Sequence, residues 1–93
     1  MVKNNYSYDK GAVEVLKDYS TYDKSLDKKP IYKKLSNDKK KGIYTDKKAD
    51  KLFYSYADKT ANKFYNRFGY KTPKNERKVL AQEFKKEFER KIK

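Results

Sequence analysis

The chain of 93 residues contains no cysteine, no histidine and no tryptophan. Without cysteine it can form neither a disulfide nor a thiolate metal site, which leaves its redox compartment open. No apolar run approaches the roughly 20 residues that a membrane-spanning helix needs. The first residues also lack the apolar core of a signal peptide. We therefore expect a cytoplasmic protein with no transmembrane segment.

Arginine is scarce as well, since lysine supplies all but three of the 26 basic side chains. The lysine ammonium is a mobile point charge, whereas the planar arginine fork suits bidentate contacts to bases. This ratio favours attraction to a phosphate backbone over the reading of a base sequence. The codon bias of an AT-rich genome is a competing explanation, because it also enriches lysine, asparagine and tyrosine.

What the chain has in excess is positive charge and aromatic rings. Thirteen acidic residues leave a net charge of +13, and 16% of the residues are aromatic. Residues 1–26 are neutral overall, whereas residues 27–51 and 52–93 carry net charges of +6 and +7. A basic excess of this size indicates an anionic partner such as nucleic acid, a membrane surface or an acidic protein.

The clearest pattern in the chain predicts an α-helix over residues 46–68. Thr45 is placed to cap its first turn, and Gly69 follows its last apolar residue, where a left-handed residue often ends a helix. The apolar arc is wide enough to pack between two neighbours, and we expect Phe64 to be deeply buried. Spacings of three and four place these residues on one face: Ala49, Phe53, Tyr56, Ala57, Thr60, Phe64 and Phe68.

Weaker patterns predict helices over residues 9–24 and 73–92, with Asp9 and Thr72 as caps and Pro73 at the first helical position. Arg77 falls within the predicted inner stripe of the last helix.

The remaining segments are shorter. Pro30 suits the start of a short helix near residues 30–36, and residues 36–42 are predicted to form an exposed basic loop. Residues 1–8 are predicted to be a loose arm. The expected fold is a single basic all-α domain over residues 1–93, a small bundle of three main helices plus a short one.

Two lysine-rich surfaces are candidate anion-binding sites. One is the face of helix 46–68 opposite its apolar arc, and the other is the basic loop with the segment before it. Tyr32 and Tyr44 lie among these lysines and are candidates for stacking on bases. The competing interpretation is a solvated face and a polar loop whose tyrosines pack on the core. The candidate nucleic-acid-binding residues are Lys33, Lys34, Lys39, Lys40, Lys41, Lys47, Lys48, Lys51, Lys59 and Lys63.

Catalysis and metal binding are not favoured by the sequence. A tyrosine nucleophile needs neighbouring acids, bases or metal ligands, and the chain has no histidine or cysteine to contribute. Glu76, Glu83 and Glu87 share one flank of the last predicted helix, but interspersed lysines make ion pairs their simpler use. We expect no enzymatic activity, no metal and no cofactor.

The sequence leaves more than one function open. The first hypothesis is a non-enzymatic protein that binds the RNA or DNA backbone electrostatically, with little sequence specificity. The second is an inhibitor encoded by a phage or mobile element, which binds a host protein or nucleoprotein complex in the manner of an anti-CRISPR protein. A third is an accessory protein of a mobile element that bends or coats DNA.

Overall fold

Residues 10–91 form four helices in the computed structural model, and no strand occurs among these described residues. The helices are α1 (Lys10–Tyr22), α2 (Lys29–Lys41), α3 (Asp46–Phe68) and α4 (Lys74–Lys91). The expected all-α bundle is therefore confirmed. The arm predicted at residues 1–8 lies outside the described residues, as does Asp9, the predicted cap of the first helix.

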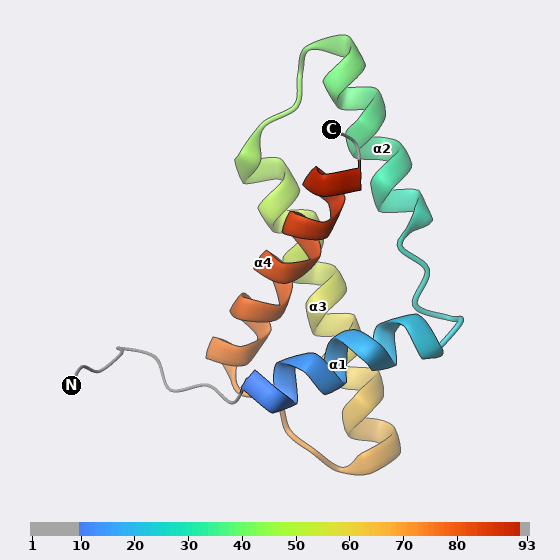
Figure 1. The fold of residues 1–93 in the computed structure, drawn as a ribbon, viewed down its shortest axis with the longest axis vertical. Helices are drawn as coiled ribbons and strands as arrows, with labels where there is room; N and C mark the ends of the chain where they lie inside the picture. Colours follow the sequence, from blue (N-terminus) through green and yellow to red (C-terminus); the bar gives the residue numbers. More distant parts are fainter. Residues whose placement is uncertain (1–9, 92–93) are drawn as a thin grey trace, which may run out of the picture.

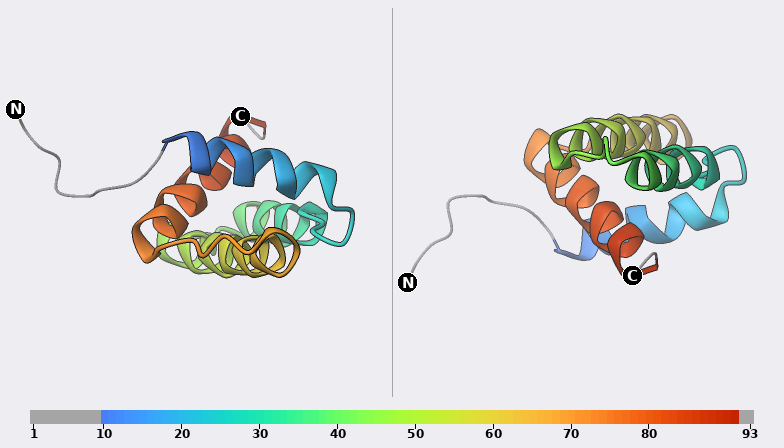
Figure 2. Two further views of the ribbon diagram at one scale, coloured as in Figure 1. Left: turned by 90° about the horizontal axis from the view of Figure 1, so that it is seen from below. Right: turned by 90° about the horizontal axis from the view of Figure 1, so that it is seen from above.

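The helices lie in two layers, as Figures 1 and 2 show. α2 and α3 run side by side in one layer, while α1 and α4 form the other. α3 packs most extensively against α4, and α1 crosses both of them near the lower end in Figure 1. None of the described helices covers the outer side of α3, so a long face of this helix stays in contact with solvent.

α3 has the bounds that the sequence predicts. The Thr45 hydroxyl accepts a hydrogen bond from the Lys48 amide at 3.2 Å, which satisfies one of the free donors of the first turn. Gly69 ends the helix with a φ of 78°, and its amide donates to the Tyr65 carbonyl at 2.8 Å. Both predicted ends of α3 are confirmed.

α2 is longer than the predicted helix near residues 30–36, and the predicted basic loop at residues 36–42 is wrong, since residues 36–41 are helical. Gly42 ends α2 with a φ of 74°. The amides of Gly42 and Ile43 donate to the carbonyls of Lys39 and Asp38 at 3.1 and 2.9 Å, which satisfies the last carbonyls. Because lysines of the last turn also lie at the negative end of the helix dipole, the polar run is stable as a helix.

The start of α4 differs from the prediction in detail. The helix begins at Lys74, and the Pro73 carbonyl accepts a hydrogen bond from the Arg77 amide at 3.1 Å. Thr72 is buried, and its hydroxyl makes no hydrogen bond within the described structure, so the predicted side-chain cap is wrong. The Thr72 carbonyl instead accepts a hydrogen bond from the Arg77 guanidinium at 3.0 Å.

The core lies between the two layers and is rich in aromatic rings. The Tyr56 ring packs edge-on against Phe84, with ring centroids 4.9 Å apart. Its hydroxyl donates a 2.7 Å hydrogen bond to the Leu26 carbonyl, which ties the α1–α2 turn to α3. The largest fully buried apolar side chains come from all four helices: Leu16, Leu35, Phe53, Leu80, Phe84 and Phe88.

The apolar face of α3 continues beyond this core. Phe68 is 59% exposed and Phe64 is only partly buried, so the prediction that Phe64 is deeply buried is wrong. The reason is the crossing of α1, which covers α3 at Tyr19 but leaves the last turns of α3 extending past it (Figure 1). The periodicity of a helix shows which residues share a face, but not how far a neighbouring helix covers that face.

Candidate nucleic-acid interface

Most acidic side chains of the described region form ion pairs within the bundle. Glu83 and Glu87 of α4 lie 3.4 and 3.6 Å from the Lys17 ammonium of α1. These two glutamates therefore form ion pairs, but their main partner is a lysine of α1. Of the interspersed α4 lysines, Lys86 lies 3.9 Å from Glu83. Further pairs join Lys28 to Glu87 at 3.7 Å, and Lys85 to Asp46 and Asp50 at 3.5 and 3.0 Å.

Two of the predicted site lysines have an internal partner. Asp38 is buried near the end of α2, and its carboxylate lies 3.8 Å from the Lys34 ammonium and 3.6 Å from that of Lys48. The pair with Lys48 links α2 to the first turn of α3. An anionic ligand at Lys34 or Lys48 would have to compete with this buried carboxylate, so both lysines have less charge to offer.

The two tyrosines predicted to stack on bases pack against the protein. The ring of Tyr32 meets Phe88 and Phe53 edge-on, at centroid distances of 5.1 and 6.3 Å. The Lys39 ammonium lies over the Tyr44 ring, 4.3 Å from its centroid. Burial raises the pKa of both hydroxyls above its usual value. We therefore leave Tyr32 and Tyr44 out of the candidate interface.

α2 presents a second group of predicted lysines on its outer side. Lys33, Lys34 and Lys41 line a shallow hollow together with Asn37, and Lys40 is exposed in the same last turn. These side chains therefore lie on a helix, and not in the basic loop that the sequence predicts. α2 therefore adds positive charge beside α3, although Asp38 lies at the floor of this hollow.

A long row of basic side chains, interrupted by Ser55, winds along the exposed side of α3. Lys51, Ser55, Lys59, Lys63 and Arg67 follow one another at intervals of four residues. Each interval advances ~6 Å along the helix and turns ~40° about its axis, so the row spans roughly 24 Å and winds from the outer face at Lys51 toward α1 at Arg67. Apart from Lys63, which is partly buried, these side chains are exposed. We call this set the α3 ridge.

Acidic side chains do little to cancel the charge of the α3 ridge. Asp58 is the last acidic residue of α3, and it pairs with Arg77 of α4 at 2.7 Å. No acidic residue occurs from Lys59 to Asn75, whereas this stretch contains five basic ones. Hydrogen bonds from Tyr19 and Ser25, together with the nearby charge of Lys63, lower the pKa of Asp23 to about 2, so this carboxylate stays ionised and offsets part of the charge at Lys63.

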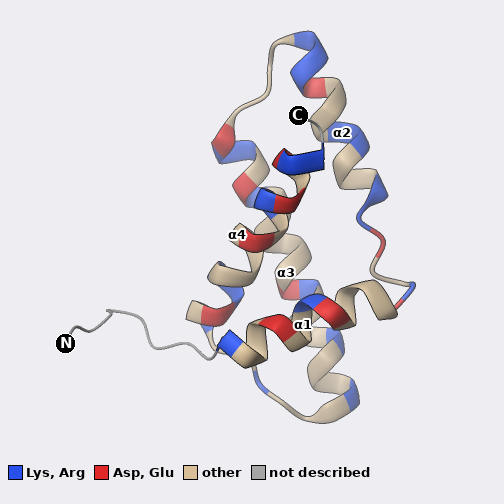
Figure 3. Ribbon diagram, viewed as in Figure 1, with Lys and Arg blue, Asp and Glu red and all other residues tan. Residues whose placement is uncertain are grey.

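A groove between α3 and α4 extends this surface. Lys47 and Lys51 line it from α3, and Lys78 faces them from α4. Asn75 and Gln82 add amide groups that can donate hydrogen bonds to phosphate oxygens. Sequence reasoning missed these three α4 residues, because only the packing of α4 on α3 brings them beside the predicted lysines. Figure 3 shows basic positions on all four helices, and α2 carries a run of them with a single acidic position, Asp38.

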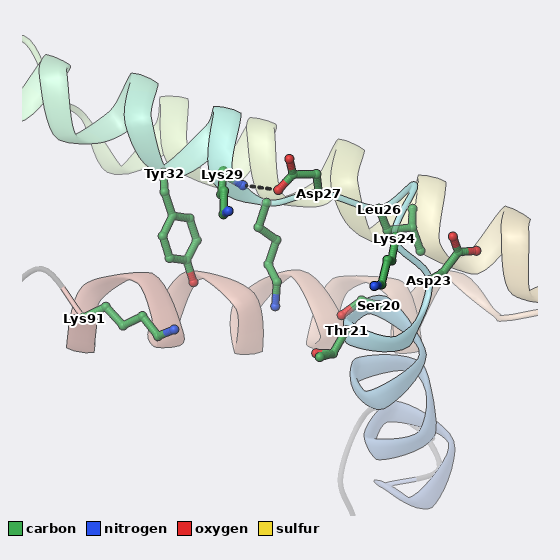
Figure 4. Close-up of a pocket in the computed structure, with 10 residues that line it drawn as sticks. Ser20, Thr21, Asp23, Lys24, Leu26, Asp27, Lys29, Tyr32 and Lys91 are labelled. Carbon is green, nitrogen blue, oxygen red and sulfur yellow. Dashed lines mark hydrogen bonds between the residues drawn. The ribbon is translucent and has the colours of Figure 1, made fainter.

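A further hollow lies between the α1–α2 turn and α4 (Figure 4). Its polar groups have structural roles. The Asp27 carboxylate accepts a 2.9 Å hydrogen bond from the Lys29 amide at the start of α2, drawn as a dashed line. Lys28 pairs with Glu87, and its ammonium lies 5.1 Å from the Phe84 ring centroid. These contacts of Asp27 and Lys28 attach the α1–α2 turn to the bundle, and the hollow lies apart from the α3 side chains of the candidate interface.

Among residues 10–91, no group of three or more acidic, histidine or cysteine side chains is placed to hold a metal ion. In the same part of the chain, no helix combines the length and the apolar character needed to cross a membrane. Comparisons with protein-family models, with curated proteins and with solved structures found no match to this chain.

Proposed function

We propose that this protein is a non-enzymatic nucleic-acid-binding protein, which attracts the phosphate backbone to the outer face of α3 with little sequence specificity. The interface consists of the α3 ridge and the lysines of the α3–α4 groove, and α2 supplies additional positive charge at its edge.

The observation that carries the proposal is a difference between two groups of basic residues. One group forms ion pairs between the helices, and the other forms none within residues 10–91. Lys17, Lys28, Lys85 and Arg77 neutralise acids between the helices. Lys51 and Lys59, by contrast, form no ion pair with any described carboxylate and are exposed on one face. When lysines of such a face neutralise phosphates, the cations condensed on the nucleic acid are released, and this release is the main source of sequence-independent affinity.

The regular spacing of the α3 ridge supports a linear anion over a compact one. Charges spaced ~6 to ~12 Å apart on a row that winds gradually around a helix can follow a backbone that carries a phosphate at each nucleotide. Since the ridge has a single arginine, bidentate recognition of guanine is not its main chemistry. A phosphate-tracking surface therefore fits the side chains better than a sequence-reading one.

Fluorescence anisotropy with labelled duplex DNA, single-stranded DNA and RNA tests the proposal directly. For three to five phosphate contacts, the logarithm of the association constant should fall with the logarithm of salt concentration, with a slope of about −3 to −4.5 for duplex DNA and about −2 to −3.5 for single strands. Unrelated sequences of equal length should bind with similar affinity. If none of these nucleic acids binds even at low salt, the proposal fails, and the inhibitor of a host protein becomes the better explanation.

A further inference from the structure

The end of the bundle at the C-termini of α1 and α3 carries a cluster of aromatic rings that the core does not cover. Tyr22 is 66% exposed and Phe68 is 59% exposed. The ring of Tyr19 lies below both, with centroid distances of 6.1 Å to Tyr22 and 6.0 Å to Phe68. Phe64 supports Phe68 from the side at 4.7 Å. We call the exposed pair, Tyr22 and Phe68, the aromatic platform.

Arg67, the last member of the α3 ridge, lies close to both rings of the aromatic platform. The Arg67 guanidinium carbon is 5.8 Å from the Tyr22 ring centroid and 5.9 Å from that of Phe68. A guanidinium at these distances presents a flat cation beside flat rings, which is a surface that bases stack on. Lys71 lies near by in the chain, with its ammonium 6.0 Å from the exposed ring of Tyr65.

The charge around the aromatic platform favours an anionic ligand. The stretch from Lys59 to Asn75 contains Arg67 and Phe68, and it has five basic residues and no acidic one. The Asp23 carboxylate accepts a 2.6 Å hydrogen bond from the Tyr19 hydroxyl below the platform and offsets only part of this positive charge. Exposed tyrosine, phenylalanine and arginine also suit protein interfaces. This surface is continuous with the row of cations on α3, which favours nucleic acid over a protein as its ligand.

We infer that the aromatic platform stacks unpaired bases, so that the protein prefers single-stranded nucleic acid over a duplex. The inference rests on the proposed function, because the α3 ridge would hold the phosphates of the same strand. A strand that follows the ridge from Lys51 toward Arg67 arrives at Tyr22 and Phe68. In a duplex the bases are already stacked on one another, so they are not available to stack on the rings. A duplex would contact this surface through its phosphates alone.

The test compares an oligothymidylate strand with a hairpin duplex that carries the same number of phosphates. Phe68→Ala and Tyr22→Ala should each weaken binding of the strand about tenfold and change duplex binding by less than about twofold. Phe68→Leu keeps apolar bulk but removes the ring face, so it should resemble Phe68→Ala on the strand. Ile43→Ala is the matched control, because Ile43 is an exposed apolar residue at the other end of α3, and it should change neither affinity.

A base analogue gives a second readout that reports stacking itself. The fluorescence of 2-aminopurine within the strand should fall when wild-type protein binds, and should fall less with Phe68→Leu at equal occupancy. Equal losses of strand and duplex binding in the Phe68 variants would overturn the inference, since stacking is lost only from unpaired bases.

The other outcomes separate this inference from the proposed function. If wild-type protein binds both ligands and the platform variants bind them equally well, the platform inference is wrong and the proposed function stands. If wild-type protein binds neither ligand, both are wrong. If sedimentation shows a dimer that Phe68→Ala dissociates, the platform is a contact between copies of the chain, and the inference is also overturned.

Discussion

The Arg77 guanidinium of α4 donates a 2.7 Å hydrogen bond to the Asp58 carboxylate of α3. This pair fixes α4 against α3, and it neutralises the last acidic side chain of α3 before the acid-free stretch that begins at Lys59. One contact therefore serves both the packing of the bundle and the positive potential of the α3 ridge.

The pair should contribute measurably to stability. A double-mutant cycle with Asp58→Asn and Arg77→Met should give a coupling energy of about 1 kcal/mol, because both side chains are only partly exposed and the geometry is close. Chemical denaturation of the four proteins measures it. A coupling energy indistinguishable from zero would mean that the contact is not maintained in solution.

The aromatic residues of the core and of the aromatic platform should differ in their effect on stability. Phe84 is fully buried, so Phe84→Ala should lower the free energy of unfolding by ~3–5 kcal/mol. Phe68 is more than half exposed, so Phe68→Ala should cost less than ~1 kcal/mol. Equal losses in thermal or chemical unfolding would contradict the position of α1 across α3.

The end of α2 provides a test of the corrected helix boundary. Gly42 has a φ of 74°, and no atom lies within 4 Å of where a β-carbon would be. Gly42→Ala should therefore destabilise the fold by ~1 kcal/mol through backbone strain alone. Gly42→Asn should cost less, because asparagine adopts the left-handed conformation more readily. If alanine were tolerated without cost, the helix would not end at this residue.

Alkaline pH should weaken the link between Tyr56 and the α1–α2 turn. Burial raises the pKa of the Tyr56 hydroxyl to about 12, compared with about 10 in an unfolded chain. Because the raised pKa favours the protonated form in the folded state, this contribution is complete below pH ~10 and is lost as the pH rises toward ~12. The stability difference between wild type and Tyr56→Phe should therefore shrink over this range, and a constant difference would contradict the assignment.

The sequence predicts α3 well because local signals mark both of its ends. Thr45 and Gly69 have side-chain and backbone properties that act within a few residues, so their roles need no tertiary information. α2 is harder to predict because few of its residues are buried, Leu35 and Asp38 among them, and its second half, residues 36–41, contains no apolar residue. Gly42 after three lysines was the local signal that could have marked its end.

The same contrast between local signals and tertiary packing applies to the candidate interface. The basic face of α3 can be predicted from helical spacing, since its members lie on one element. The pairing of Lys48 with Asp38 could not be predicted from helical spacing, because the two residues belong to different helices, α3 and α2. The position of Lys78 in the groove and the exposure of Phe68 likewise depend on where α4 and α1 pack against α3.

The central claim, that the outer face of α3 is the nucleic-acid-binding surface, is tested most directly by two matched triple variants. One replaces Lys51, Lys59 and Lys63 of the α3 ridge with glutamine. The control removes three charges from α1, the α1–α2 turn and α4, at Lys10, Lys24 and Lys91, all of which are exposed and form no ion pair with a described carboxylate.

The measurement is the salt dependence of binding to one labelled single strand, by fluorescence anisotropy. The ridge variant should bind more than about tenfold more weakly than wild type at low salt, with a salt slope smaller in magnitude by about 2 to 3. The control should keep a slope within about 1 of the wild-type value, because its charges are not placed along the ridge. A control variant that loses affinity and slope as much as the ridge variant, or more, would contradict the claim.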